Sequence, residues 1–154
     1  MGDFEKFYNS ALRFLSFRPR SEKELRTNLK GKHATNEIIE KIIIKLKEKR
    51  FINDEEFAKG WIESRLRFKP RSLRLIKLEL RQKGIADEII ESGIMNQELG
   101  TDSDLEQAKK LVEKRIKRVG HLPKQEVYQK LGRYLASKGF SWDTIKKAID
   151  PVKS

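Results

Sequence analysis

FRPRS at residues 17–21 returns as FKPRS at residues 68–72, with a single Arg-to-Lys change. Proline disfavours helical geometry in the residue before it, so one helix should end just before Pro19 and another just before Pro70. Serine is a favoured N-cap, and Ser21 is followed three residues later by glutamate, the spacing of a capping box. Each copy is therefore predicted to join two helices.

The residues around the two copies repeat in the same register. Apolar residues recur at helical spacing along nearly the whole chain, without an alternating strand pattern. Taking His33, Gly84 and Gly139 as equivalent markers, the repeats are offset by 51 and 55 residues. A pair of apolar residues four positions apart precedes each marker: Leu25 and Leu29, Ile76 and Leu80, Leu131 and Leu135.

Self-similarity of this kind is typical of stacked units that share a core with their neighbours. We expect an all-α protein of three tandem three-helix repeats that form an elongated, curved array. The predicted repeats are residues 1–52, 53–97 and 102–154, with a polar linker at 98–101. Thr35 or Asn36 should cap the third helix.

The charge of the chain is concentrated in three blocks. Its 154 residues include 35 Lys and Arg and 23 Asp and Glu, a net charge of +12. Residues 13–32, 65–83 and 109–138 carry +5, +7 and +8, and the remainder carries −8. Each block covers the middle helix of a repeat and the turn that precedes it. This pattern favours a basic face that binds a polyanion over basic residues that merely face water.

Arginine can donate two hydrogen bonds to one anionic group, and rows of like charge are best tolerated when a ligand neutralises them. The residues predicted to bind DNA phosphates or an acidic protein surface are Arg18, Arg20, Arg26, Arg65, Arg67, Lys69, Arg71, Arg74, Lys77, Arg81, Lys83, Arg115, Arg118, Lys124, Lys130, Arg133 and Lys138.

The aromatic residues leave two interpretations open. Phe17 and Phe68 lie among the basic residues, where they could stack on unpaired bases, but a buried contact that closes each repeat is preferred. Trp61 and Trp142 are expected in the core. The helix that carries Leu75 and Leu78 is apolar on two sides, which favours contact between neighbouring repeats over a protein-binding ridge.

A catalytic constellation is not evident. The chain has no Cys, and the two histidines, His33 and His121, fall in different predicted turns, so the sequence predicts no metal site and no cofactor. Asp54, Glu55 and Glu56 could form the Mg²⁺ site of a nuclease, but acids after Asn53 are also what a helix N-terminus prefers, and we favour the cap.

The beginning of the chain is acidic, and its apolar runs are only a few residues long. Neither export nor a membrane span is expected, and the absence of Cys favours the cytoplasm.

Three stretches together resemble the RecX family of bacterial RecA regulators: FINDEEFAKGWIESR at 51–65, KLELRQKGI at 77–85 and KLGRYLASKGFSWDTI at 130–145. The resemblance covers nearly the whole chain and includes the three tandem repeats. One departure lies at Ser72, where the family often has glycine. After the Pro-Arg pair, it makes this joint stiffer and more basic than a glycine would.

The resemblance implies a regulator without enzymatic activity whose partners are RecA and the RecA filament on single-stranded DNA. Members generally inhibit the ATPase, strand-exchange and co-protease activities of RecA, and some bind DNA directly. The alternative from the charge pattern is a general nucleic-acid-binding repeat protein that acts without RecA.

Overall fold

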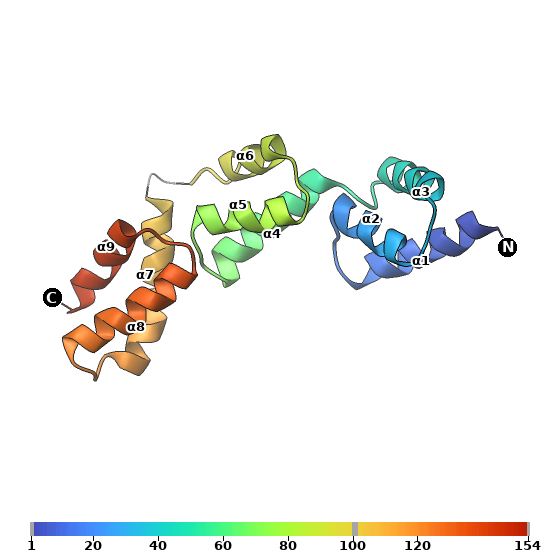
Figure 1. Cartoon of the computed structure of the whole chain (residues 1–154). Helices are drawn as coiled ribbons and strands as arrows, with labels where there is room; N and C mark the ends of the chain where they lie inside the picture. Colours follow the sequence, from blue (N-terminus) through green and yellow to red (C-terminus); the bar gives the residue numbers. More distant parts are fainter. Residues whose placement is uncertain (1, 100–101, 154) are drawn as a thin grey trace. The chain divides into compact units, whose positions relative to one another are not determined.

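The computed structural model describes residues 2–99 and 102–153 (Figure 1). Within these ranges the chain forms nine α-helices and no strand, as predicted for an all-α protein. Two residues of the predicted linker, 100 and 101, lie outside the described residues. The helices are α1 (Asp3–Phe17), α2 (Glu22–Gly31), α3 (Asn36–Glu48), α4 (Asp54–Phe68), α5 (Leu73–Gln82), α6 (Asp87–Met95), α7 (Ser103–Val119), α8 (Lys124–Ser137) and α9 (Trp142–Lys153).

The predicted caps account for several helix starts. The Ser21 Oγ accepts a hydrogen bond from the Glu24 N–H, and the Glu24 carboxylate accepts one from the Ser21 N–H, which confirms the capping box of α2. At α3 the Thr35 Oγ1 accepts from the Ile38 N–H at 3.3 Å. At α4 the Asn53 Oδ1 accepts from the Glu56 N–H at 3.1 Å. These side chains satisfy amides that have no partner inside the helix.

The middle helices α2, α5 and α8 end in the same way. His33, Gly84 and Gly139 have left-handed backbones, with φ of 70°, 79° and 88°. The next residue turns its N–H back to the helix, as when the Ile85 N–H donates to the Leu80 carbonyl at 3.0 Å. This is the pattern of a Schellman C-cap, which confirms these positions as equivalent markers.

The chain groups into two units. Unit 1 contains the chain up to residue 60 together with Leu80–Gly93. Its apolar core is built by α1, α2 and α3, where the stripes predicted from the sequence meet, and includes Ala11, Leu25, Leu29, Ile42, Ile43 and Leu46.

Unit 2 contains Trp61–Glu79 and the chain from Ile94 onward. Its main core is built by α7, α8 and α9 and includes Ala108, Val112, Val127, Leu131, Leu135, Ile145 and Ile149. Helices α4 and α5 supply buried residues to both units, since Ala58 and Leu80 belong to unit 1, and Ile62 and Ile76 to unit 2. The elongated, curved shape and the repeat boundaries stay predictions.

Candidate nucleic-acid interface

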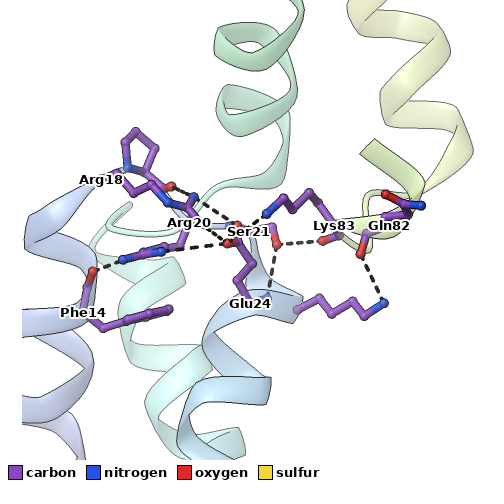
Figure 2. A network of polar contacts seen from close by, with 9 residues as sticks. Phe14, Arg18, Arg20, Ser21, Glu24, Gln82 and Lys83 are labelled. Carbon is purple, nitrogen blue, oxygen red and sulfur yellow. Dashed lines mark hydrogen bonds and ion pairs between the residues drawn. The ribbon is translucent and has the colours of Figure 1, made fainter. Parts of the chain in front are cut away.

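Within unit 1, the serine of FRPRS joins two repeats as well as two helices (Figure 2). Ser21 is buried, and its Oγ donates a hydrogen bond to the Lys83 carbonyl at the end of α5 at 2.7 Å. Beside it, the Glu22 N–H donates to the Asp54 Oδ1 at 2.9 Å, and the Lys23 Nζ donates to the Gln82 carbonyl at 3.3 Å. We call this group the first joint.

Within unit 2, the serine of FKPRS occupies an equivalent site, which we call the second joint. Ser72 is buried, its N–H donates to the Lys138 carbonyl at 3.0 Å, and its Oγ accepts from the Leu75 N–H at 3.1 Å. The Leu73 N–H donates to the Asp104 Oδ1 at 2.9 Å, as Glu22 does to Asp54. The serine of each copy is therefore structural.

Each joint also needs a glycine. A Cβ on Gly84 would lie 2.5 Å from the Lys23 Cβ, and one on Gly139 would lie 2.9 Å from the Leu75 Cβ. Both glycines combine a left-handed backbone with a close approach, so a side chain would be strained twice. His33, at the equivalent position of the first repeat, is exposed. Leu75 thus contacts the neighbouring repeat, as predicted, whereas Leu78 is 44% exposed.

Three of the predicted ligand-binding cations lie around the first joint. Glu24 forms ion pairs with Arg18, with Arg20 at 4.0 Å and with Lys83 at 3.4 Å, and the Arg20 guanidinium also lies 3.9 Å from the Phe14 ring centre (Figure 2). Burial opposes the charge of Glu24, but the hydrogen bonds from Arg18 and Ser21 and the charge of Lys83 outweigh it and hold the pKa of Glu24 below its ordinary value.

A second cluster lies on α4 and α5 in unit 2. Glu79 accepts hydrogen bonds from the Trp61 Nε1 at 3.1 Å and the Arg65 Nε at 3.4 Å, and forms an ion pair with Arg71. The side chains of Arg65 and Arg71 are only 19% and 13% exposed. Since Trp61 is half-buried and holds one of these bonds, its predicted core role is met only in part.

Other predicted cations are also engaged within the chain. Arg26 forms ion pairs with Glu22 and Glu40, and Arg81 pairs with Asp87 at 3.0 Å. Arg74 donates to the Gly139 carbonyl at 3.3 Å. Lys77 too has an interaction within the chain.

Two cations of the third repeat lie on one ring. Arg115 and Lys138 lie over Tyr134, with 3.9 Å and 5.7 Å to the ring centre. Their charges remain available to an anion, because a ring does not neutralise them.

A third group is exposed and forms no ion pair with the described residues. It consists of Arg67, Lys69, Arg118, Lys124, Lys130 and Arg133, all of which belong to unit 2. Charges that face water and lack an acidic partner can bind phosphate without breaking an internal contact. This group is the part of the predicted basic face that is most open to a ligand.

Exposed aromatic side chains accompany some of these charges, and here three predictions of burial were wrong. Phe17 and Phe68 are 75% and 67% exposed, and Trp142 is 63% exposed. Phe17 follows the buried Ala11 by six residues and Phe68 follows the buried Ile62 by six, a rotation of about 120° away from the core. Because Arg67 lies over the Phe68 ring at 5.2 Å, this corner presents a ring and a cation together.

The remaining candidates for chemistry are the two histidines and the acids at the start of α4. His33 and His121 are exposed. Burial raises the pKa of Asp54 above its ordinary value, and the charge of Glu22 raises it further. The hydrogen bond that the Asp54 carboxylate accepts from the Glu22 N–H offsets this rise only in part. Within the described ranges, no three His, Asp or Glu side chains are grouped so that they could hold a metal ion. Nor does any described helix have the length and apolar character needed to cross a bilayer.

Counting charge in blocks missed four acidic residues: the ion-pair partners Glu24 and Glu79, and the joint residues Asp54 and Asp104. The signal for the joint residues is present in the sequence, because both aspartates lie in the first turn of the first helix of a repeat. Glu24 and Glu79 occupy different positions in their repeats, so no repeated pattern points to them.

The three repeats match three family models, described as the first, second and third three-helix domains of RecX. The matches cover residues 8–46, 53–94 and 102–149.

Curated relatives named Regulatory protein RecX are similar over nearly the whole chain. The protein of Bacillus subtilis (strain 168) is 32% identical over 151 residues, which cover 98% of this chain and 56% of the relative. The chain thus spans about half the length of this relative. The protein of Prosthecochloris aestuarii is 31% identical over 152 residues, covering 97% of this chain and 95% of the relative.

Solved structures agree with this likeness. The crystal structure of RecX from Lactobacillus salivarius matches with a TM-score of 0.76 and 31% identity, covering 97% of this chain and 96% of that one. A second crystal structure, of regulatory protein RecX, matches with a TM-score of 0.75 and 28% identity, covering 96% and 71%. This chain therefore belongs to the RecX family of regulatory proteins.

Proposed function

We propose that this protein binds the RecA recombinase and its filament on single-stranded DNA, and lowers the ATPase, strand-exchange and co-protease activities of RecA. The observation that carries the proposal is its place in a family of regulatory proteins, with all three domains matched. The proposed activity is binding rather than catalysis, and its place is the cytoplasm, where RecA assembles on DNA.

The exposed cations support a contact with a polyanionic filament. Arg67, Lys69 and the exposed basic residues of α7 and α8 can meet DNA phosphates or acidic side chains of RecA. The internally paired cations, such as Arg18, Arg71 and Arg81, could join the interface only by exchanging an acidic partner for the ligand. We therefore expect them to add less to binding than the exposed group.

Three linked repeats also suit a filament. When one repeat is bound, the others are held near the neighbouring protomers at high effective concentration, so weak contacts add up. A titration into RecA on single-stranded DNA tests the proposal. ATP hydrolysis should slow and filament lifetime should shorten at stoichiometric protein, and no change in either quantity would overturn it.

A second candidate is a general nucleic-acid-binding protein that acts without RecA. The exposed aromatic and basic corner at Phe68 favours it, because rings that stack on bases and cations that hold phosphates serve any single strand. This candidate predicts binding to DNA alone that weakens steeply with salt. Salt-insensitive binding to RecA would reject it.

A further inference from the structure

A shallow groove lies along α8 in unit 2. Gln125, Tyr128, Gln129, Gly132 and Arg133 line it at spacings of three and four, which place them on one face of the helix. Ala136 and Trp142, the first residue of α9, complete the lining. The volume of the groove is about 450 Å³.

Trp142 is placed to offer a ring to a ligand. A Cβ on Gly132 would lie 3.7 Å from the Trp142 Cζ3, so the ring lies against a bare stretch of α8. Even so, 63% of the residue is exposed. A large aromatic side chain that gains so little from burial leaves most of its stacking surface to water.

We propose that this groove binds an unpaired base of a single-stranded nucleic acid, with the base stacked on Trp142. Gln125 and Gln129 line the groove and are exposed, and their carboxamides carry the paired donor and acceptor that match the edge of a base.

The charge around the groove favours the same ligand. Arg133 lies in its wall, and Lys124 and Lys130 are exposed on the same helix, where Glu126 is the one acid in the described range 124–137. A base in the groove would bring its phosphates near these cations. This inference deepens the proposed function and rests on it for the source of the strand, the DNA in the RecA filament.

The chain offers a direct reporter, because it has only two tryptophans. In the Trp61→Phe protein, the emission comes from Trp142 alone. Titration of this full-length variant with a homothymidine strand should quench that emission, and an abasic strand of equal length should bind through its phosphates without quenching it. The inference is overturned if the thymidine strand does not quench the emission, or if both strands quench it equally. Quenching by RecA without DNA, together with none by the thymidine strand, also overturns it and assigns the groove to a protein.

Affinity gives a second readout. Trp142→Ala should weaken binding of the thymidine strand by about 5- to 160-fold, the usual contribution of one stacked base, while Trp142→Phe should keep most of the binding. Phe51→Ala is the matched control, because Phe51 is also an exposed aromatic residue but lies outside the three basic blocks. Equal affinities of the Trp142→Ala and Phe51→Ala proteins, with unchanged circular dichroism, contradict the inference.

The RecA assays separate this inference from the proposed function. If the unaltered protein slows RecA and yet its thymidine complex shows no quenching, the groove assignment fails and the proposed function stands. If quenching occurs and RecA is unaffected, the proposed function fails and the groove still binds a base.

Discussion

The Ser21 Oγ donates a hydrogen bond to the Lys83 carbonyl, 62 residues further along the chain, at a distance of 2.7 Å. One hydroxyl thus caps the beginning of α2 and satisfies a carbonyl at the end of α5. Ser72 holds the equivalent place before α5, with its own N–H donating to Lys138. Each joint therefore couples the start of one middle helix to the end of the next.

Ser21→Ala and Ser72→Ala should each lower the free energy of unfolding by about 1–2 kcal/mol, because each removes a buried N-cap at a joint. Urea unfolding followed by circular dichroism measures this. Ser137→Ala is the control, since Ser137 is exposed and its Oγ donates to the Tyr134 carbonyl within one helix. A loss at Ser137 equal to that at the joints would contradict a special role of the joint serines.

Gly139→Ala should lower the free energy of unfolding by about 2–4 kcal/mol, from the left-handed backbone and the overlap with Leu75. Gly31→Ala is the matched variant, because nothing lies within 4 Å of a Cβ at this helical position, and it should raise stability by up to about 1 kcal/mol. Denaturant midpoints of the two proteins should move in opposite directions. Equal shifts would show that the second joint tolerates a side chain.

Glu79→Gln should lower the free energy of unfolding by about 1–3 kcal/mol, since two little-exposed arginines, Arg65 and Arg71, lose their shared anion. The same change should leave single-strand affinity unchanged or raise it, because both arginines are released to phosphate. Glu63→Gln makes the same change of charge at an exposed position of α4 and should alter neither quantity. Weaker DNA binding by Glu79→Gln would mean that the cluster itself shapes the interface.

Stability should fall as the pH drops below about 5, because the pKa of Glu24 is lower in the folded protein than in the unfolded chain. The pKa of Asp54 is higher in the folded protein than in the unfolded chain. Its ionisation therefore lowers the free energy of unfolding as the pH rises through the folded-state pKa. At pH 7, Glu24→Gln should cost about 1 kcal/mol, and near pH 3 its difference from the unaltered protein should vanish. Urea titrations at both pH values measure the difference. A constant difference would exclude the ion pairs of Glu24 as its cause.

Replacement of Arg67 and Lys69 together by alanine should weaken binding of single-stranded DNA without changing stability, because both are exposed and form no ion pair with the described residues. If each neutralises one phosphate, the logarithmic salt slope should fall by about 1.4. Fluorescence anisotropy across a salt series gives this slope. The double variant of Lys49 and Lys59, exposed lysines outside the basic blocks, is the control, and an equal effect there would mean that only net charge matters.

Local rules predicted the helices of this protein well. Helices end before Pro19 and Pro70, and Ser21 forms a capping box, because each of these features depends on residues a few positions apart. The apolar stripes that build the two cores followed from apolar periodicity for the same reason.

The candidate site was harder to predict, because it depends on partners distant in the sequence. Charge blocks could not separate Arg71, which is paired with Glu79, from Lys69, which faces water two residues earlier. The exposure of Phe17 and Phe68 could be worked out from helical rotation. That of Trp142 could not, because it depends on how α9 meets α8.

The two joints have a direction. One half is a serine that begins a middle helix, and the other half is a glycine that follows the next one, so the halves cannot exchange places. If the first repeat were moved to the second or third place, His33 would occupy the position of Gly84 or Gly139. Its side chain would then meet the neighbouring repeat. The first repeat could therefore be moved to the second or third place only with His33→Gly, which means that the order of the modules is encoded in single side chains.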